Sequence, residues 1–325
     1  MYKSKLSIRQ TQSAIQDLRS YFQDLLKLEL NLTRATAPLF VTSESCLNDG
    51  LNGEKPVSFL PKNSTEELQI VHSLAKWKRQ ALHDYDFNLY EGLFTDMNAI
   101  RREEELDNIH SYYVDQWDWE KIIDKKDRNI EYLKYTVNKI YKSVLLTKKH
   151  INEKFKLDTK FSKEVFFISS QQLENLYPEL TSEEREQKLA KEKGTIFIYQ
   201  IGWPLKSGYV QSRRAFDYDD WDLNGDLIIY APWLDKAIEI SSMGIRVDRD
   251  ALLKQSNRSV QELTEMSEFH ANILNNLLPL TIGGGIGQSR LCMLILEKHH
   301  IGEVQSSYWP EKMKQELAEQ NIHLL

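Results

Sequence analysis

The chain has 325 residues, which suits one large α/β domain or two smaller ones, and its 41% hydrophobic and 28% charged residues are ordinary for a globular protein. The formal net charge of −6 argues against a general nucleic-acid coat, and no apolar run is long enough to span a bilayer, so neither a nucleic-acid nor a membrane partner is expected. The polar residues 1–10 exclude a secretory signal, and Cys46 and Cys292, which lack CxxC spacing, favour a reducing cytoplasm.

The N-terminal part of the chain predicts one long helix, then a loop, then short elements. Apolar residues recur at helical spacing over residues 5–30, where no Gly or Pro interrupts them. A short strand is predicted at 39–41, and residues 42–61, rich in Ser, Asn, Asp and Gly, predict a loop long enough to be functional. The next predicted elements are a strand at 68–72, a helix at 73–83 and a strand at 89–101.

The segment 110–119 is strand-like but carries polar residues on both faces. In a strand, one face would hold Tyr112, Val114, Gln116 and Asp118, and the other Tyr113, Asp115, Trp117 and Trp119. A core strand is not expected to be polar on both sides, so this pattern predicts a sheet that forms the floor of a polar site.

The second half of the chain mixes helices and strands without regular βαβ alternation. Its predicted elements are a helix at 127–155, a strand at 164–169, a helix that starts with a capping box at 181–184 and ends near Gly194, short strands at 195–201, 226–230 and 237–242, a helix at 260–277, and a strand, glycine turn and buried helix over 280–296. This order predicts an α/β (α+β) fold with a mostly antiparallel sheet flanked by helices, formed by residues 1–325 as a single domain.

A glycine run near the C-terminus is the first candidate for a site. Gly283, Gly284, Gly285 and Gly287 permit a close approach of the backbone to a flat or charged ligand, and Arg290 follows at the start of an apolar helix. There an arginine can stack on a purine or face a phosphate. The alternative interpretation is a tight turn that needs glycine only for packing, and the dinucleotide-binding fingerprint fits poorly.

The acidic segment 217–226 is the second candidate. Its closely spaced carboxylates repel one another unless they meet cations, so it is either a solvated acidic turn or a place that holds Mg²⁺ or an ammonium group. The spacing of a calcium loop is absent. Asp226 begins one predicted strand and Glu239 lies on the next, and together they would make a two-carboxylate Mg²⁺ site completed by nucleotide phosphates.

Arg101 is the third candidate, because it stands at the end of a predicted strand, opposite the polar segment that begins at His110. A fixed arginine there suits a clamp on phosphate or carboxylate. The alternative is a surface salt bridge with the acids at 103–105. Lys76 and Lys78 belong to a basic helix, and such a face is usually only solvated.

These pieces, in this order, resemble the catalytic domains of class II aminoacyl-tRNA synthetases, and even more closely the family of ammonia-dependent asparagine synthetases, the aspartate–ammonia ligases. The resemblance extends over nearly the whole chain. It is carried by VHSLAKWKRQ (71–80), EGLFTDMNAIR (91–101), YVDQWDWE (113–120), DYDDW (217–221), LNGD (223–226), EISSMGIRVD (239–248) and TIGGGIGQSRLCML (281–294). Each motif alone is weak, and the combination is specific.

The resemblance implies a role for each matched residue. It implies ATP binding by Arg101, His110, Gly285, Gly287 and Arg290, with Arg101 on the α-phosphate and Arg290 on the adenine. It implies Mg²⁺ binding by Asp226, Glu239 and Ser242. It implies substrate binding by Asp49, Lys78, Gln116, Asp118, Ser241 and Arg246. Catalysis would rest on Arg101 and on a carboxylate that deprotonates ammonia, for which Asp219 and Asp115 both remain candidates.

The implied reaction converts L-aspartate, ATP and ammonia into asparagine, AMP and pyrophosphate through a β-aspartyl-adenylate. A homodimer is expected from the resemblance and from the apolar stripe of the first helix. Glutamine is not expected as the nitrogen donor, because Met1 is followed by Tyr2 rather than Cys. A tRNA synthetase paralogue with another acceptor is the alternative, although no separate anticodon-binding barrel is expected ahead of the first helix. A silent regulatory relative is disfavoured by the retained Arg101, Arg290, Asp226 and Glu239.

Overall fold

The computed structural model describes residues 2–50 and 53–325, and its centre is an eight-stranded sheet in the order β1-β5-β6-β11-β10-β9-β8-β7. The strands are β1 Leu32–Arg34, β5 Gly92–Ile100, β6 Tyr113–Ile122, β7 Phe166–Ser169, β8 Thr195–Tyr199, β9 Asp219–Ala231, β10 Lys236–Arg246 and β11 Thr281–Gly287. The outer pairs β1–β5 and β7–β8 are parallel and the inner pairs are antiparallel. The predicted mostly antiparallel sheet is therefore confirmed.

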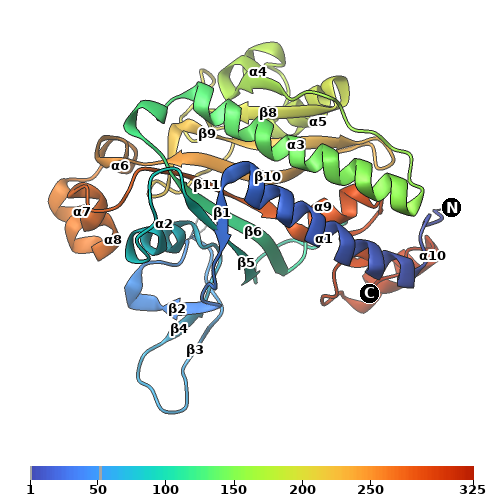
Figure 1. Cartoon of the computed structure of the whole chain (residues 1–325), viewed down its shortest axis with the longest axis horizontal. Coiled ribbons are helices and arrows are strands. Elements are labelled where there is room, and N and C mark those ends of the chain that lie inside the picture. Colours follow the sequence, from blue (N-terminus) through green and yellow to red (C-terminus); the bar gives the residue numbers. More distant parts are fainter. Residues whose placement is uncertain (1, 51–52) are drawn as a thin grey trace.

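Among the described residues, ten α-helices pack around the central sheet, and a small second sheet lies to one side of it (Figure 1). The small sheet holds β2 Phe40–Thr42, β4 Leu68–Ile70 and β3 Ser58–Phe59. The α-helices are α1 Ile8–Leu30, α2 Ala75–Asp84, α3 Ile130–Phe155, α4 Ser170–Leu176, α5 Ser182–Lys193, α6 Arg249–Ser256, α7 Val260–Met266, α8 Glu268–Leu274, α9 Gln288–Ile295 and α10 Glu311–Glu319. Within the described residues, no helix combines the length and apolar character that crossing a membrane requires.

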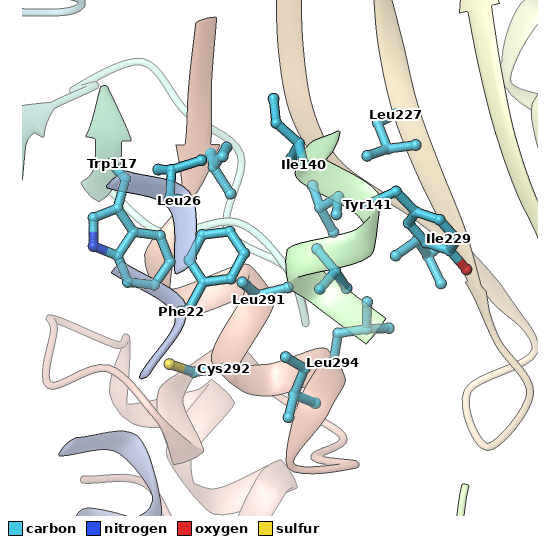
Figure 2. Packing of buried hydrophobic residues seen from close by; sticks show 14 of the residues in the cluster. Phe22, Leu26, Trp117, Ile140, Tyr141, Leu227, Ile229, Leu291, Cys292 and Leu294 are labelled. Carbon is cyan, nitrogen blue, oxygen red and sulfur yellow. The ribbon is translucent and has the colours of Figure 1, made fainter. Parts of the chain in front are cut away.

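One face of the central sheet is covered by α1, α3 and α9, and this face holds the main hydrophobic core (Figure 2). Phe22 of α1 packs against Trp117 of β6, with ring centroids 4.7 Å apart, and Leu291 of α9 joins them in the same cluster. Burying a side chain of this size contributes roughly 1.5–3 kcal/mol. The apolar stripe of α1 is thus used inside this chain, and it does not by itself require a partner subunit.

The other face of the sheet is covered only towards its two edges. At one edge α2 packs on β5 and β6, and at the other α4 and α5 pack on β7, β8 and β9. A cleft lies between these two groups of helices, over the middle strands β6, β11 and β10. The helices at the edges therefore leave the centre of the sheet available as the floor of a site.

The predicted helices at 5–30, 73–83 and 181–194 are confirmed, with ends that differ by a few residues. The capping box at Thr181 forms as expected. The helix predicted over 127–155 begins only at Ile130, where the Asn129 side chain caps it, because residues 125–127 form a 3₁₀ turn. The helices α4, α6 and α10 and the strand β1 were not predicted.

Two predicted elements are wrong in kind, and for the acidic segment the structure excludes one of the two alternatives. The single helix over 260–277 is two helices, because the Ser267 side chain accepts a hydrogen bond from the backbone N–H of His270 and starts α8 there. The glycine run is not a turn but lies inside β11. The acidic segment 217–226 is not a solvated turn, since β9 begins at Asp219 and both Asp219 and Asp220 are buried.

The loop predicted over 42–61 is mostly irregular, with a 3₁₀ turn at Ser43–Ser45 and the two residues of β3 near its end. Residues 51 and 52 of this predicted loop lie outside the described residues. The remaining predicted strands are present, displaced by a few residues at their ends.

Candidate active site

The floor of the cleft is formed by alternate side chains of β6. Asp118 and Glu120 point into the cleft side of the sheet, where both contact Lys78 of α2, whereas Trp117 and Trp119 lie in the core on the helical side. A strand places successive side chains on opposite faces, so the same ten residues supply both a hydrophobic core and a polar floor. The predicted division of this strand into two faces is confirmed.

The glycines of β11 make room for the polar side chains of β6. A Cβ atom on Gly283 would collide with the carboxylate of Glu120, and one on Gly285 would collide with the side-chain amide of Gln116. The two glycines are therefore required for space on the cleft side of the sheet, in an ordinary strand conformation. The space that the side chains of β6 need therefore explains the glycine run, which a turn or the approach of a ligand alone would not explain.

At one end of the cleft, a network of buried ion pairs surrounds Arg246. Its guanidinium donates to Glu120 at 2.7 and 3.0 Å and also to Asp219. Beside it, the buried ammonium group of Lys78 donates to Asp118 and, at 3.2 Å, to the carbonyl of Gly284. Fixed charges of both signs in one enclosed space suit a small zwitterionic ligand.

Burial and these partners shift the pKa values of the groups in opposite directions. Burial raises the pKa of Asp219 above its ordinary value, although Arg246 opposes this. Burial would also raise the pKa of Glu120, but the charge and hydrogen bonds of Arg246 hold it below its ordinary value. Burial lowers the pKa of Lys78 even though Asp118 opposes it. Burial therefore favours the protonated form of Asp219, whereas Arg246 favours the ionised form of Glu120.

At the other end of the cleft, two arginines are directed into the same space. Arg290, in the first turn of α9, donates to the carbonyl oxygens of Ile109 at 3.3 Å and Glu239 at 3.2 Å. Arg101 follows directly after β5, and its buried Nε has no hydrogen-bond partner among the described residues. His110 stands beside them, held by Asp107 at 2.8 Å. This end suits an anionic ligand with a flat group.

Asp226 and Glu239 lie on neighbouring strands, as predicted. A β-bulge in β10 determines which side chains of this strand point towards the cleft. Asp226 pairs with Ser242 across β9 and β10, and the register shifts between Glu239 and Ser241. The bulge lets Ile240 and Met243, three residues apart, both point into the core, so Glu239 and Ser242 both face the cleft. Without the bulge, one of these two side chains would be in the core.

These residues fit a magnesium site of the kind that relies on nucleotide phosphates. One oxygen of Asp226 is paired with Arg214, and its other oxygen, Oδ1, is buried with no partner in the part of the chain that the structure describes. Enclosure by the protein and the charge of Asp226 raise the pKa of Glu239, and Arg290 opposes this. In the same described part, no group of three His, Cys, Asp or Glu residues could hold a metal alone. Two carboxylates with phosphate and water as further ligands are typical of Mg²⁺.

Asp115 lines the cleft together with Asp219, but its carboxylate has different partners. It borders the cleft, but it lies on the same side of β6 as Trp117. Its carboxylate accepts hydrogen bonds from the backbone N–H of Ser289 at 3.0 Å and from its hydroxyl at 2.8 Å, and it pairs with Arg19 at 2.7 Å. The structure therefore commits this carboxylate to holding α9 and α1 on the sheet.

The cleft gathers nearly all of the residues that the sequence nominated. It is lined by Asp49, Lys78, Arg101, His110, Asp115, Gln116, Asp118, Asp219, Glu239, Ser241, Ser242, Arg246, Gly285, Gly287 and Arg290. Asp226 is not among the lining residues and lies beside Ser242, its partner on the neighbouring strand. The hydroxyl of Ser241 donates to the carbonyl of Gly285 at 2.9 Å, which ties β10 to β11.

Sequence reasoning missed several residues of the site. Glu120 is the central partner of Arg246, and it could have been found by extending the alternation of Gln116 and Asp118 by two residues. Arg214 was not predicted as a site residue, yet it is the partner of Asp226. Glu186 of α5 lies near Asp226, and burial with the charge of Asp226 raises its pKa to about 8; no local pattern signals it.

Comparison with known proteins gives a consistent result. A family model described as aspartate–ammonia ligase matches residues 9–321. The aspartate–ammonia ligase of Clostridium perfringens strain SM101 is 56% identical, covering 100% of this chain and 97% of its own length. That of Bacillus cytotoxicus is 53% identical over the full length of both chains.

Among solved structures, two asparaginyl-tRNA synthetases in complex with asparaginyl-adenylate have a similar fold. The one from Entamoeba histolytica has a TM-score of 0.66 and 16% identity, covering 93% of this chain and 68% of that one. The one from Pyrococcus horikoshii has a TM-score of 0.65 and 16% identity, covering 92% and 70%. The predicted synthetase-like fold is therefore confirmed.

Proposed function

The chain belongs to the aspartate–ammonia ligase family, so it is an ATP-dependent ligase that makes asparagine from aspartate, and we propose that it does so through a β-aspartyl-adenylate in the cleft over β6, β11 and β10. The observation that carries this proposal is the pairing of two unlike ends in one cleft. One end holds fixed charges of both signs around Arg246, and the other holds Arg101 and Arg290.

The proposal assigns the Arg246 end to aspartate. The buried Asp118 is suited to its α-ammonium group, and Lys78 and Arg246 are suited to its carboxylates. Asp49, Gln116 and Ser241 line the same region and are assigned to substrate positioning. A site with partners for every charged group of aspartate would reject an amino acid that lacks one of them, because a buried charge would stay unpaired.

The other end is assigned to ATP. Arg101, whose buried Nε has no partner among the described residues, is assigned to the α-phosphate, where charge develops as the β-carboxylate attacks. Arg290 is assigned to the adenine ring, with Gly285 and Gly287 giving space beside it and His110 near the phosphates.

We assign Mg²⁺ to Asp226, Glu239 and Ser242. When bound, the ion supplies charge neutralisation to the phosphates. The oxygen Oδ1 of Asp226, which has no partner among the described residues, and the cleft-facing position of Glu239 support this assignment. Arg214 shares Asp226 and is a second positive charge at the same point.

The second half of the reaction forms the amide. The nitrogen of ammonia bonds to the acyl carbon, the bond from that carbon to the AMP oxygen breaks, and nitrogen loses a proton. We assign that proton to Asp219, because burial raises its pKa. Asp115, the other candidate base, already accepts from Ser289 and pairs with Arg19, so we assign it to positioning.

We further propose that the protein is a homodimer and works in the cytoplasm. Leu28 of α1 and Tyr135 of α3 are 78% and 55% exposed on two helices that pack together, and apolar groups of this size are common at subunit interfaces. The free thiols of Cys46 and Cys292 support a reducing compartment. Light scattering at micromolar concentration tests the dimer, and a monomer mass would contradict it.

Product analysis with aspartate, ATP and ammonium chloride tests the reaction. Asparagine, AMP and pyrophosphate should form in equal amounts, and aspartate should support exchange of pyrophosphate into ATP without ammonia. ADP and phosphate as products would reject the adenylate. Glu239→Gln keeps the shape but removes a charge from the proposed ion site, so it should abolish both reactions while the circular dichroism spectrum stays unchanged. Full activity of this variant at low Mg²⁺ would refute the metal assignment.

A further inference from the structure

Arg290 is held in the cleft at its guanidinium and at its backbone. Its guanidinium donates to the carbonyl oxygens of Ile109 at 3.3 Å and Glu239 at 3.2 Å. Its backbone is the third residue of α9, in the first turn of the helix. The stem of the side chain lies over Gly287, since a Cβ atom there would be 3.4 Å from the Cβ atom of Arg290 and 3.7 Å from its Cδ atom. The direction of this arginine therefore depends on where the first turn of α9 stands.

The first turn of α9 has no cap from its own sequence. Gly287 is the N-cap residue and has no side chain that could accept a hydrogen bond. The side chain of Ser, Thr or Asp, the usual N-cap residues, would lie against the stem of Arg290 at this position. The backbone N–H groups of a first turn have no acceptor inside the helix. Because Gln288 and Ser289 are buried, an acceptor has to come from another element rather than from bulk water.

Asp115 of β6 supplies that acceptor. Its Oδ1 atom accepts from the backbone N–H of Ser289 at 3.0 Å, and its Oδ2 atom accepts from the hydroxyl of Ser289 at 2.8 Å. A negative charge at this end of a helix is also favoured by the helix dipole. Ser289 directly precedes Arg290, so the two bonds fix the neighbour of the residue that faces the cleft. A distant carboxylate thus takes the place of a local N-cap residue.

Two further residues hold Asp115 and Ser289 in this arrangement. Arg19 of α1 donates to Oδ2 of Asp115 at 2.7 Å and balances its charge. The Nε2 atom of Gln305 donates to the hydroxyl oxygen of Ser289 at 3.1 Å and to the backbone carbonyl of Tyr113 at 3.1 Å. Asp115, Ser289 and Gln305 are all buried, so the network is shielded from solvent and its geometry is fixed.

We propose that Asp115, supported by Arg19 and Gln305, is a positioning residue for Arg290. It sets the first turn of α9 and, through that turn, the direction in which the guanidinium enters the cleft. The proposal rests on the proposed function for the part that Arg290 plays towards ATP. Among the described residues that line the cleft, none belongs to α1, so this helix acts on the ATP end of the cleft through Arg19.

Asp115→Ala removes both acceptor oxygens and tests the proposal. KM for ATP should rise by roughly five- to tenfold and kcat should fall by less than about threefold, because Arg290 is assigned to a contact that is the same before and during reaction. The decisive measurement is the same substitution in an Arg290→Ala background. There KM for ATP should rise by less than about twofold, since the side chain that Asp115 positions is absent.

Two milder variants should act in the same direction. Asp115→Asn keeps the volume and one acceptor oxygen, so its rise in KM for ATP should be smaller, and it takes the place of Asp115→Ala if that variant does not fold. Arg19→Met should also give a smaller rise, because Ser289 and Gln305 remain in contact with Asp115. Both effects should again disappear in the Arg290→Ala background.

Lys148→Met is the matched control at the other end of α9. Lys148 is buried and donates to the carbonyl oxygen of Ile295, the last residue of the helix, at 2.8 Å. Its loss should lower the free energy of unfolding, measured by urea denaturation, because a carbonyl at the end of the helix loses its partner. KM for ATP should stay within about twofold of wild type, since Arg290 lies at the opposite end.

The proposal would be overturned if folded Asp115 variants kept the wild-type KM for ATP and kcat. An equal rise in KM with and without the Arg290 side chain, or an equal rise in Lys148→Met, would also overturn it. Coupling between Asp115 and Arg290 in kcat instead of KM would keep Asp115 as the positioning residue and move Arg290 from the adenine to the phosphates. Wild-type enzyme without aspartate-dependent exchange of pyrophosphate into ATP would instead refute the proposed function.

Discussion

The two faces of the central sheet are made by the same strands and differ in almost every physical property. On the helical face, Phe22, Trp117 and Leu291 form a continuous apolar core. On the cleft face, Glu120 and Arg246 form buried ion pairs instead. The register of side chains along a strand is all that separates the two environments. One sheet can therefore carry a stabilising apolar core on one face and the groups of a reactive site on the other.

The two faces also differ in what they contribute to the free energy of folding. Burial of apolar area on the helical face is directly stabilising. On the cleft face, the desolvation of Glu120, Arg246 and Asp219 offsets most of their mutual attraction. The ion pairs therefore hold charges in fixed positions more than they stabilise the fold, and removing one partner is costly because the other stays buried.

The largest effect is expected from breaking the cleft network at its centre. Arg246→Met should reduce the free energy of unfolding by about 3–5 kcal/mol, the cost of leaving a buried charge without its partner. It should also abolish synthesis. Urea denaturation and product analysis measure the two effects.

Phe22→Leu is the matched change on the helical face: it should lose stability but keep kcat/KM for aspartate at temperatures where it is folded. Equal loss of activity in both variants would contradict the division between faces.

Arg101→Ala should have the next largest effect, on rate and not on stability. Arg101 is assigned to the phosphate that gains charge in the transition state, so its loss should lower kcat by roughly 10²–10³-fold. The free energy of unfolding should change little, because its Nε has no partner to lose among the described residues. Steady-state kinetics at saturating ATP measure the effect. A variant whose only defect is a raised KM for ATP would show that the nucleotide is oriented the other way.

A smaller effect is expected from Arg290→Ala. Stacking on adenine is the same before and during reaction, so it changes KM for ATP more than kcat. The loss should be on the order of 1–2 kcal/mol, the scale of a guanidinium–aromatic contact. Titration of ATP binding measures the loss of binding free energy, and initial-rate kinetics measure KM for ATP and kcat. A normal KM with a collapsed kcat would move Arg290 to the phosphates.

The smallest effects concern pH, and they should run in opposite directions on the two faces. On the helical side, Glu297 is buried, yet hydrogen bonds from Lys148 and Lys5 bring its pKa to about 2. Its pKa in the unfolded chain is about 4.3. The stability that it contributes is present above that value and is lost as pH falls towards 2. The difference in unfolding free energy between wild type and Glu297→Gln should therefore shrink over this range.

On the cleft face, where α5 packs on the sheet, burial of Glu186 and the charge of Asp226 raise the pKa of Glu186 to about 8. A raised pKa contributes stability that is present below the unfolded value of about 4.3 and is lost as pH rises through 8. Glu186→Gln should therefore become more stable relative to wild type as pH rises over this range. Urea denaturation at several pH values in the presence of a chelator tests both variants. Parallel pH profiles for Glu186→Gln and wild type would contradict the raised pKa.

Most residues of the candidate site could be predicted from the sequence, because they lie in compact motifs on regular elements. Arg101 ends β5, Arg290 begins α9, and Gln116 and Asp118 alternate along β6. The roles that the resemblance implies for these residues remain predictions. Local sequence patterns did not reveal Arg214 or Glu186. Each belongs to the site only because folding brings it close to Asp226, which lies on a different segment of the chain.

The sequence by itself determined the class of fold, the order of most elements and the family, because apolar periodicity and motif spacing are local properties of the chain. Only the tertiary structure decided which of the acids face one another. It paired Asp115 with Ser289 and Arg19 and paired Asp219 with Arg246, and through a bulge in β10 it put Glu239 and Ser242 on the same face. The physical reason is that the facing of a strand residue and the pKa of a buried group depend on neighbours brought in by packing, and those neighbours are not adjacent in the sequence.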